Sequence, residues 1–122
     1  MHNFEKLLFW QKSIEPLKEV YIVCADLPND EKFGLISQIK RSVISIPSNI
    51  AEGAGRNNDS EFFHFLAIAN ASSFELQTQL ILTRELNLLD AEKVNSLISK
   101  LNEIQRMIYS FKANLKSNLK QK

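Results

Sequence analysis

The sequence predicts an all-α protein, an up-down-up-down four-helix bundle that forms a single domain over residues 1–122. Apolar residues recur in steps of three and four along four segments, and no segment alternates regularly between apolar and polar residues. Three Gly and three Pro are few for a sandwich or barrel with many turns. Hydrophobic residues make up 44% of the chain, which is enough to build a core.

The first helix is expected over residues 7–24. Its main stripe consists of Leu7, Trp10, Ile14, Leu17, Tyr21 and Cys24. Pro16 lies inside this pattern and removes a backbone hydrogen bond, so we expect a kink or a local restart near Ser13. Residues 27–30, Leu-Pro-Asn-Asp, should end this helix and cap the next one.

The second helix has an equally regular stripe. It consists of Ile36, Ile39, Val43, Ile46 and Ile50. Pro47 falls within the stripe and predicts a second kink. Gly53 and Gly55 are expected to end the helix, because glycine readily adopts the left-handed conformation of a C-cap. Residues 53–58 should then form the loop.

The third helix should begin at Asn58, because an Asn followed three residues later by a Glu approaches a capping box. Its main stripe is Phe62, Leu66, Ala69, Ser73, Leu76 and Leu80. It should end near Leu86, and the short turn 87–90 requires an antiparallel neighbour. The fourth helix shows three heptads typical of coiled-coil-like packing. They consist of Val94, Leu97, Leu101, Ile104, Ile108, Phe111 and Leu115.

Several classes of protein are excluded by composition. A single cysteine, Cys24, rules out an intrachain disulfide framework and a multi-cysteine zinc site, and its place on an apolar stripe predicts a small buried hydrophobe. The longest apolar run, residues 20–25, is far shorter than the ~18 residues of a membrane span. Glu5 and Lys6 stand where a signal peptide would be apolar. We therefore expect a cytoplasmic protein with no membrane partner.

No catalytic residue, metal or cofactor is predicted. Glu61 and His64 have the E-x-x-H spacing of di-iron bundles, but such a site needs a second pair, and the only other histidine is His2. A surface or packing histidine is the better interpretation. Residues 53–56, Gly-Ala-Gly-Arg, lack the Lys-Ser/Thr that completes a phosphate-binding loop, and helix capping explains the glycines. The chain is therefore expected not to be an enzyme.

Polar residues form a second stripe on the second and third helices. Its members are Gln38, Arg41, Ser45, Asn49 and Glu52, followed by Ser72, Glu75 and Gln79. If the two helices face each other there, Arg41 can pair with Glu75. A ligand site is one interpretation, and a structural polar network that fixes helix register or subunit contacts is the other. The network is favoured because the stripe contains neither a nucleophile nor a histidine.

The charge is unevenly distributed along the chain. Residues 93–122 contain seven Lys or Arg and one Glu, a net charge of +6, whereas residues 1–92 carry −5. Lys112, Lys116 and Lys120 repeat every four residues and share one helix face, Arg106 lies further up the same helix, and Arg56 immediately precedes the third helix. This face is either simply solvated or contacts phosphates of a nucleic acid.

The chain has more apolar residues than one core needs. The third helix carries Phe62, Phe63, Phe65 and Phe74, which cannot all face one side. The first helix adds Leu8, Phe9, Val20, Ile22 and Val23 outside its main stripe. A helix that is apolar on two faces must bury both. We therefore predict a homo-oligomer, the alternative being a monomer with some exposed aromatic residues.

Three segments resemble one known family. Residues 7–13, LLFWQKS, resemble an L-x-V-W-Q-K-A opening. Residues 42–56, SVISIPSNIAEGAGR, are similar to an A-x-S-I-P-x-N-I-A-E-G-x-G-R core, and residues 62–69 with Ser72, Glu75 and Gln79 resemble a third conserved segment. The pattern is that of the bacterial four-helix-bundle proteins encoded by intervening sequences in 23S rRNA genes, which are sometimes labelled ribosomal proteins. Ser13 and Ser42 stand where the pattern has Ala.

The resemblance implies a bundle that assembles into a barrel-like homopentamer. It also implies kinship with the accessory variability protein of diversity-generating retroelements, a basic barrel that binds nucleic acid and a reverse transcriptase. We accordingly expect a non-enzymatic oligomeric accessory protein that binds RNA or other nucleic acid through Arg56, Arg106, Lys112, Lys116 and Lys120, without base-specific readout. The alternative is an interaction scaffold for a reverse transcriptase that does not itself bind nucleic acid.

Overall fold

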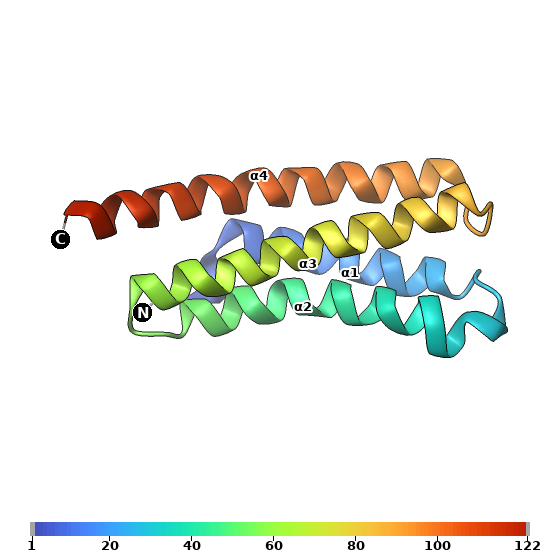
Figure 1. Ribbon diagram of the computed structural model, residues 1–122, viewed down its shortest axis with the longest axis horizontal. Helices are drawn as coiled ribbons and strands as arrows, with labels where there is room; N and C mark the ends of the chain where they lie inside the picture. The colour runs from blue at the N-terminus through green and yellow to red at the C-terminus, as the bar shows by residue number, and fades with distance from the viewer. Residues whose placement is uncertain (1, 122) are drawn as a thin grey trace.

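The computed structural model describes residues 2–121, and the side chains at positions 32, 33, 120 and 121 lie outside the description. Four α-helices run alternately up and down along the molecule, as Figure 1 shows. They are α1 (Leu8–Cys24), α2 (Ser37–Ala54), α3 (Asp59–Glu85) and α4 (Ala91–Gln121). Each helix packs against two neighbours, with α4 closing the bundle against both α1 and α3. The predicted four-helix bundle is confirmed, and residues 2–121 contain no strand.

The core consists of the apolar stripes predicted for three of the helices. In α4 the heptad positions Val94, Leu101 and Ile108 are fully enclosed, and Phe111 packs at the edge of the core. The stripes of α2 and α3 are buried as well, apart from Ile36 at the start of α2. Within residues 2–121, no helix combines the length and apolarity needed to cross a membrane.

The buried face of α1 differs from the prediction. Its core positions are Phe9, Ser13, Pro16, Val20, Val23 and Cys24. Most of the predicted stripe is only half-buried, and Tyr21 is exposed. Ser13 and Pro16 concealed the true stripe, because a serine and a proline do not count as apolar positions. Both are tolerated in the core, since the Ser13 hydroxyl donates to the Trp10 carbonyl at 2.6 Å and proline has no N–H to satisfy.

Neither internal proline interrupts its helix. The α1 helix continues through Pro16, so the expected restart near Ser13 does not occur, and α2 continues through Pro47. Between these helices the chain forms a 3-10 turn, η2 (Asn29–Glu31), and a π-helical turn, η3 (Lys32–Ile36). The predicted stop at residues 27–30 is therefore correct, although α2 begins later than Asp30 would suggest.

The glycines at the end of α2 have a different role from the predicted one. Gly53 lies inside α2, which ends at Ala54, and the connection to α3 is residues 55–58. Gly55 has φ −76°, an ordinary helical value. Gly53 is instead required by close packing, because a Cβ there would lie 2.7 Å from Phe65 Cβ. The residue with left-handed backbone is Asn87, with φ 56°, in the turn after α3.

The predicted start of α3 is confirmed in atomic detail. The side chain of Asn58 accepts a hydrogen bond from the Glu61 backbone N–H at 3.1 Å. The same end of the bundle is closed by the N-terminal segment, which contains the short 3-10 turn η1 (Phe4–Lys6). The His2 backbone N–H donates to the Ala54 carbonyl at 2.9 Å, and its ring lies 4.9 Å from that of Phe62.

Candidate nucleic-acid interface

The predicted basic residues of α4 lie on a helix whose last turns extend past the α2–α3 connection, at the left of Figure 1. Arg106 and Lys116 are exposed. Lys112 is half-buried, and its ammonium lies 5.0 Å from the centre of the Phe63 ring on α3. The side chain of Lys120 lies outside the described residues. We refer to Arg106, Lys112 and Lys116 as the α4 basic stripe.

Arg56 does not belong to this stripe. Its guanidinium lies 3.2 Å from the Glu52 carboxylate and 3.8 Å from that of Glu61, and it covers the Phe65 ring at 4.9 Å. These contacts link the end of α2 to the first turn of α3. Two neighbouring carboxylates offset the positive charge that would attract a phosphate. The surroundings of Arg56 therefore differ from those of the three residues of the α4 basic stripe.

The surroundings of Arg106 leave its positive charge available. Glu103, one turn earlier, accepts a hydrogen bond from Lys12 Nζ on α1 at 2.7 Å. That bond, together with the charges of Lys12 and Arg106, holds the pKa of the Glu103 carboxyl below its ordinary value. Glu103 is bound towards α1, and among the described residues no ion pair engages Arg106. Arg106 lines grooves on both sides of α4.

An exposed aromatic residue within the stripe was not predicted. Tyr109 is 71% exposed, and it lies three residues after Arg106, three before Lys112 and seven before Lys116. Residues at these intervals share one helix face. The spacing of Tyr109 relative to the basic residues could have revealed it from the sequence. Basic residues interleaved with an exposed ring are typical of surfaces that bind single-stranded nucleic acid.

A groove of about 430 Å³ separates this face of α4 from α3. It is lined by Asn70, Phe74, Asn102, Gln105, Arg106, Tyr109 and Ser110. Its α3 wall carries a second exposed ring, Phe74, at 51% exposure. The Gln105 side chain donates to Gln77 Oε1 at 2.9 Å, which joins the two helices at the base of the groove. The lining contains one positive charge and no carboxylate.

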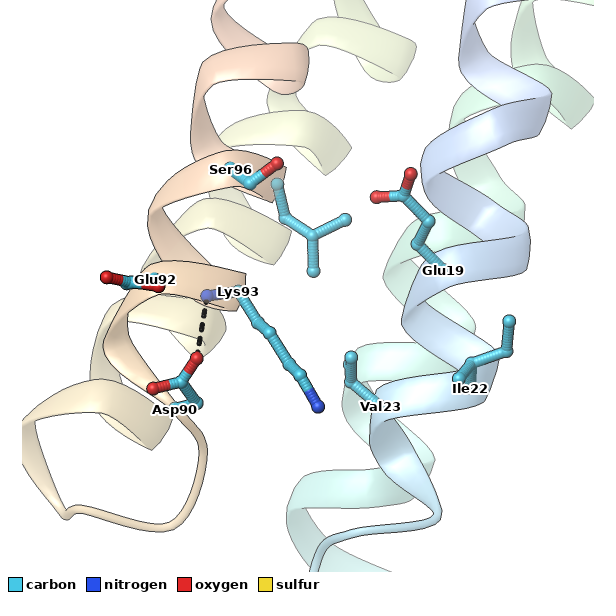
Figure 2. Close-up of a pocket in the computed structure, with 8 residues that line it drawn as sticks. Glu19, Ile22, Val23, Asp90, Glu92, Lys93 and Ser96 are labelled. Carbon is cyan, nitrogen blue, oxygen red and sulfur yellow. Dashed lines mark hydrogen bonds between the residues drawn. The ribbon is translucent and has the colours of Figure 1, made fainter.

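The groove between α1 and α4 has the opposite electrostatic character. Figure 2 shows Glu19 on α1 facing Lys93 and Ser96 on α4, with Asp90 and Glu92 at the start of α4. Its volume is about 490 Å³, and three carboxylates outnumber the single ammonium of Lys93. That ammonium also lies 3.8 Å from Asp26. Phosphates would be repelled here, so the two sides of α4 differ in the ligands they favour.

The predicted polar network forms only in part. Ser45 and Ser72 hydroxyls lie 2.7 Å apart across α2 and α3, and the Asn49 amide donates to the Ser45 hydroxyl at 2.9 Å. Further along α3, the Gln79 amide donates to Glu75 at 3.4 Å. These contacts resemble a packing network rather than an open site.

The hydrogen bonds of that network do not include Gln38, Arg41 or Glu52 among the described residues. Arg41 and Glu75 are both exposed, and no ion pair among the described residues joins them. Gln38 is also exposed, and Glu52 pairs with Arg56 instead. The predicted pairing of Arg41 with Glu75 is therefore not observed.

The residues that could bind a metal or act as a nucleophile are not arranged for either role among the described residues. Glu61 and His64 are both exposed, and the described residues contain no group of three His, Cys, Asp or Glu placed to hold a metal. Cys24 is 4% exposed, as predicted for a buried hydrophobe. Burial raises the pKa of its thiol above the ordinary value, and the nearby Lys40 opposes this weakly. A raised pKa leaves little thiolate at neutral pH, which together with burial makes Cys24 a poor candidate for a nucleophile.

The comparisons with known proteins agree with this fold. A crystal structure from Bacteroides thetaiotaomicron, described as a protein with unknown function from the S23 ribosomal protein family, matches with a TM-score of 0.79. The two chains share 27% sequence identity over 85% of this chain and 97% of that one. Among curated proteins no match is found. The model of the family described as 23S rRNA-intervening sequence protein matches residues 5–110, and the chain therefore belongs to that family.

Proposed function

We propose that this chain is a non-enzymatic accessory protein that binds RNA through the α4 basic stripe and acts as a homo-oligomer. RNA binding is supported by the lack of carboxylate partners for the basic side chains of the stripe in the part of the chain that the structure describes. Among the described ion pairs, five basic residues are engaged, and Arg106, Lys112 and Lys116 are not among them. Positive side chains without carboxylate partners can replace counterions along a phosphate backbone.

A filter-binding titration against structured RNA at two salt concentrations tests this proposal. Reversing the charge of Lys112 and Lys116 should weaken binding and reduce its dependence on salt, because each lost phosphate contact removes released counterions. The matched control reverses Lys6 and Lys18, two exposed lysines outside α4. No binding of the unaltered protein at low salt would contradict the proposal, as would equal effects of the two double variants.

The proposed oligomer is supported by apolar side chains that remain exposed in the single chain. On the outer α2–α3 face, Ile44 is 43% exposed and Ile68 is 36% exposed. Ile44 precedes Ser45 and Ile68 lies one turn before Ser72, so both flank the hydroxyl pair that joins these helices. A second copy would bury them, and the family resemblance makes a homopentamer the expected assembly. Light scattering that gives a monomer mass would contradict this.

A second candidate function is a protein scaffold, related to the retroelement accessory proteins and serving a reverse transcriptase. The α1–α4 groove favours it, since Ile22 is 71% exposed beside Glu19 and Asp90. An apolar segment with basic flanks would complement such a surface. Ile22→Glu should abolish capture of a reverse transcriptase while leaving RNA binding unchanged. Capture of RNA alone from native cells would count against this candidate.

A further inference from the structure

Two exposed aromatic rings lie on opposite walls of the α3–α4 groove. Tyr109 is 71% exposed on α4, and Phe74 is 51% exposed on α3. Single exposed apolar residues are ordinary on protein surfaces, but these two line the same groove of about 430 Å³. That volume lies within the range of sites that hold small aromatic ligands. The groove therefore has an exposed aromatic ring on each of its two helices.

The charged residues nearby suit a ligand that carries phosphates. Arg106 lines the groove one turn before Tyr109, and Lys112 follows Tyr109 by three residues. Lys112 lies over the Phe63 ring of α3, which directs it to the α3 side of α4. The stripe thus places a positive charge on each side of the Tyr109 ring, and none of the lining residues is acidic.

The remaining lining residues can exchange hydrogen bonds with a ligand. Asn70, Asn102 and Ser110 add amide and hydroxyl groups beside the two rings, whereas the buried Gln105 amide is bonded to Gln77. Such groups can pair with base edges and with the 2′-hydroxyl of ribose. They match an apolar face of a second copy poorly, because that face would leave them without partners. The acidic groove on the other side of α4, seen in Figure 2, lacks these features.

We propose that the α3–α4 groove binds an unpaired stretch of RNA, with bases stacked on Tyr109 and Phe74 and the flanking phosphates held by Arg106 and Lys112. This inference rests on the proposed RNA binding and specifies the form of RNA that is bound. Stacked bases must be unpaired, because in a duplex their faces are already covered by neighbouring bases. Recognition is tolerant of sequence, since every base presents a ring face.

Fluorescence anisotropy with a labelled oligouridylate of about 12 nucleotides tests the inference. Tyr109→Ala and Phe74→Ala should each weaken binding roughly tenfold without changing the slope of affinity against salt. Tyr109→Phe should retain near-normal affinity, because it keeps the ring. Arg106→Gln should weaken binding and reduce the slope by about 0.7, the value of one single-strand phosphate contact. The control is Tyr21→Ala, an exposed tyrosine on α1.

The outcomes separate this inference from the proposed function. Salt-dependent RNA binding that is indifferent to Phe74 and Tyr109 overturns the stacking site alone, whereas no binding at all overturns both. Two further results overturn the assignment: equal or tighter binding of a duplex or of the same sequence in DNA, and a change of oligomer mass in Tyr109→Ala measured by light scattering. All variants alter exposed side chains, and circular dichroism verifies that each remains helical.

Discussion

At the scale of single residues, the closest approach of α2 and α3 depends on the absence of a side chain. Gly53 faces the two aromatic residues Phe62 and Phe65 at the start of α3. A Cβ atom at this position would lie 2.7 Å from Phe65 Cβ and 2.9 Å from Phe62 Cδ1. Phe62 is 1% exposed and enclosed by the core, so it cannot easily move away. This contact, and not a turn, is what requires glycine.

Gly53→Ala should therefore lower the free energy of unfolding by about 1–3 kcal/mol, the usual cost of overpacking a core. The matched control is Gly55→Ala, two residues later. Its Cβ would lie 3.5 Å from the Ala51 carbonyl oxygen, an ordinary contact, and its φ of −76° suits alanine. That variant should be unchanged or about 0.4–1 kcal/mol more stable. Urea denaturation measures both, and equal losses would contradict this packing argument.

Ser42 has a buried hydroxyl that makes no hydrogen bond among the described residues. The side chain is 2% exposed, and its Oγ has no hydrogen-bond partner among the described residues. A buried hydroxyl that lost its water without gaining a partner destabilises the fold. Ser42→Ala should raise the free energy of unfolding by about 1 kcal/mol.

The comparison for this prediction is Ser73→Ala, the same change at a fully buried hydroxyl that donates to the Asn70 carbonyl at 2.6 Å. That variant loses a formed hydrogen bond and should not gain stability. Thermal denaturation of both variants provides the measurement. If Ser42→Ala were less stable than Ser73→Ala, the hydroxyl of Ser42 would have to be bonded in solution.

At the scale of the helices, two ion pairs join α1 to α4. Lys12 pairs with Glu103, and Glu19 pairs with Lys100. Hydrogen bonding to Lys12 holds the pKa of Glu103 below its ordinary value. Hydrogen bonding to Glu19 raises the pKa of Lys100 above its ordinary value, against a smaller desolvation effect. Both pairs are well exposed to solvent, so their contributions to stability are small and screened by salt.

The two ion pairs should lose their contributions to folding stability at opposite ends of the pH range. The Glu103 contribution is present above its unfolded pKa of about 4.3 and is lost as the pH falls through the lower folded value. The Lys100 contribution is present below its unfolded pKa of about 10.4 and is lost as the pH rises through the higher folded value. Urea midpoints against pH should show that Glu103→Gln flattens the acid limb. An acid limb as steep as that of the unaltered protein would contradict the assignment.

How far the sequence determines each helix depends on what its buried face contains. The stripes of α2, α3 and α4 consist mainly of large apolar residues, with Ser73 as the single polar member, and their periodicity identified the core. The core face of α1 includes Ser13 and Pro16, so a search for apolar residues selected the half-buried stripe of Trp10 and Leu17 instead. Burial of a serine or proline is settled by local hydrogen bonding, which periodicity does not reveal.

The candidate interface could be predicted from the sequence only in part. The basic residues of α4 follow from their spacing, which also includes Tyr109 once aromatic residues are considered. Phe74 could not be assigned to the same groove, because the register between α3 and α4 is set by packing across the bundle. Arg56 was grouped with the other basic residues because of its charge and its place immediately before the third helix. Its neighbours Glu52 and Glu61 lie on two different helices, and the structure shows that they neutralise it.

At the scale of the whole molecule, the net charge of +1 conceals two different surfaces of one helix. The side of α4 towards α3 carries Arg106 and Lys112 with no lining carboxylate, whereas the side towards the end of α1 carries Glu19, Asp90 and Glu92. Under the proposed function, an RNA strand would be attracted to the α3 side of α4 and not to its α1 side. Assembly of several copies would repeat the attractive side without changing its local chemistry.

Repetition of the α4 basic stripe in an oligomer should change how RNA binding depends on salt. A single chain offers three described basic residues in the stripe, so the logarithm of affinity for single-stranded RNA should fall against that of salt with a slope of about −2. An oligomer that contacts one strand through several copies should show a steeper slope. Ile68→Glu, which places a charge on the α2–α3 face, should reduce the mass in light scattering and return the slope to about −2. The control is Lys18→Glu at an exposed position of α1, which should change neither the mass nor the slope. A slope that is identical before and after dissociation would mean that each strand contacts only one copy.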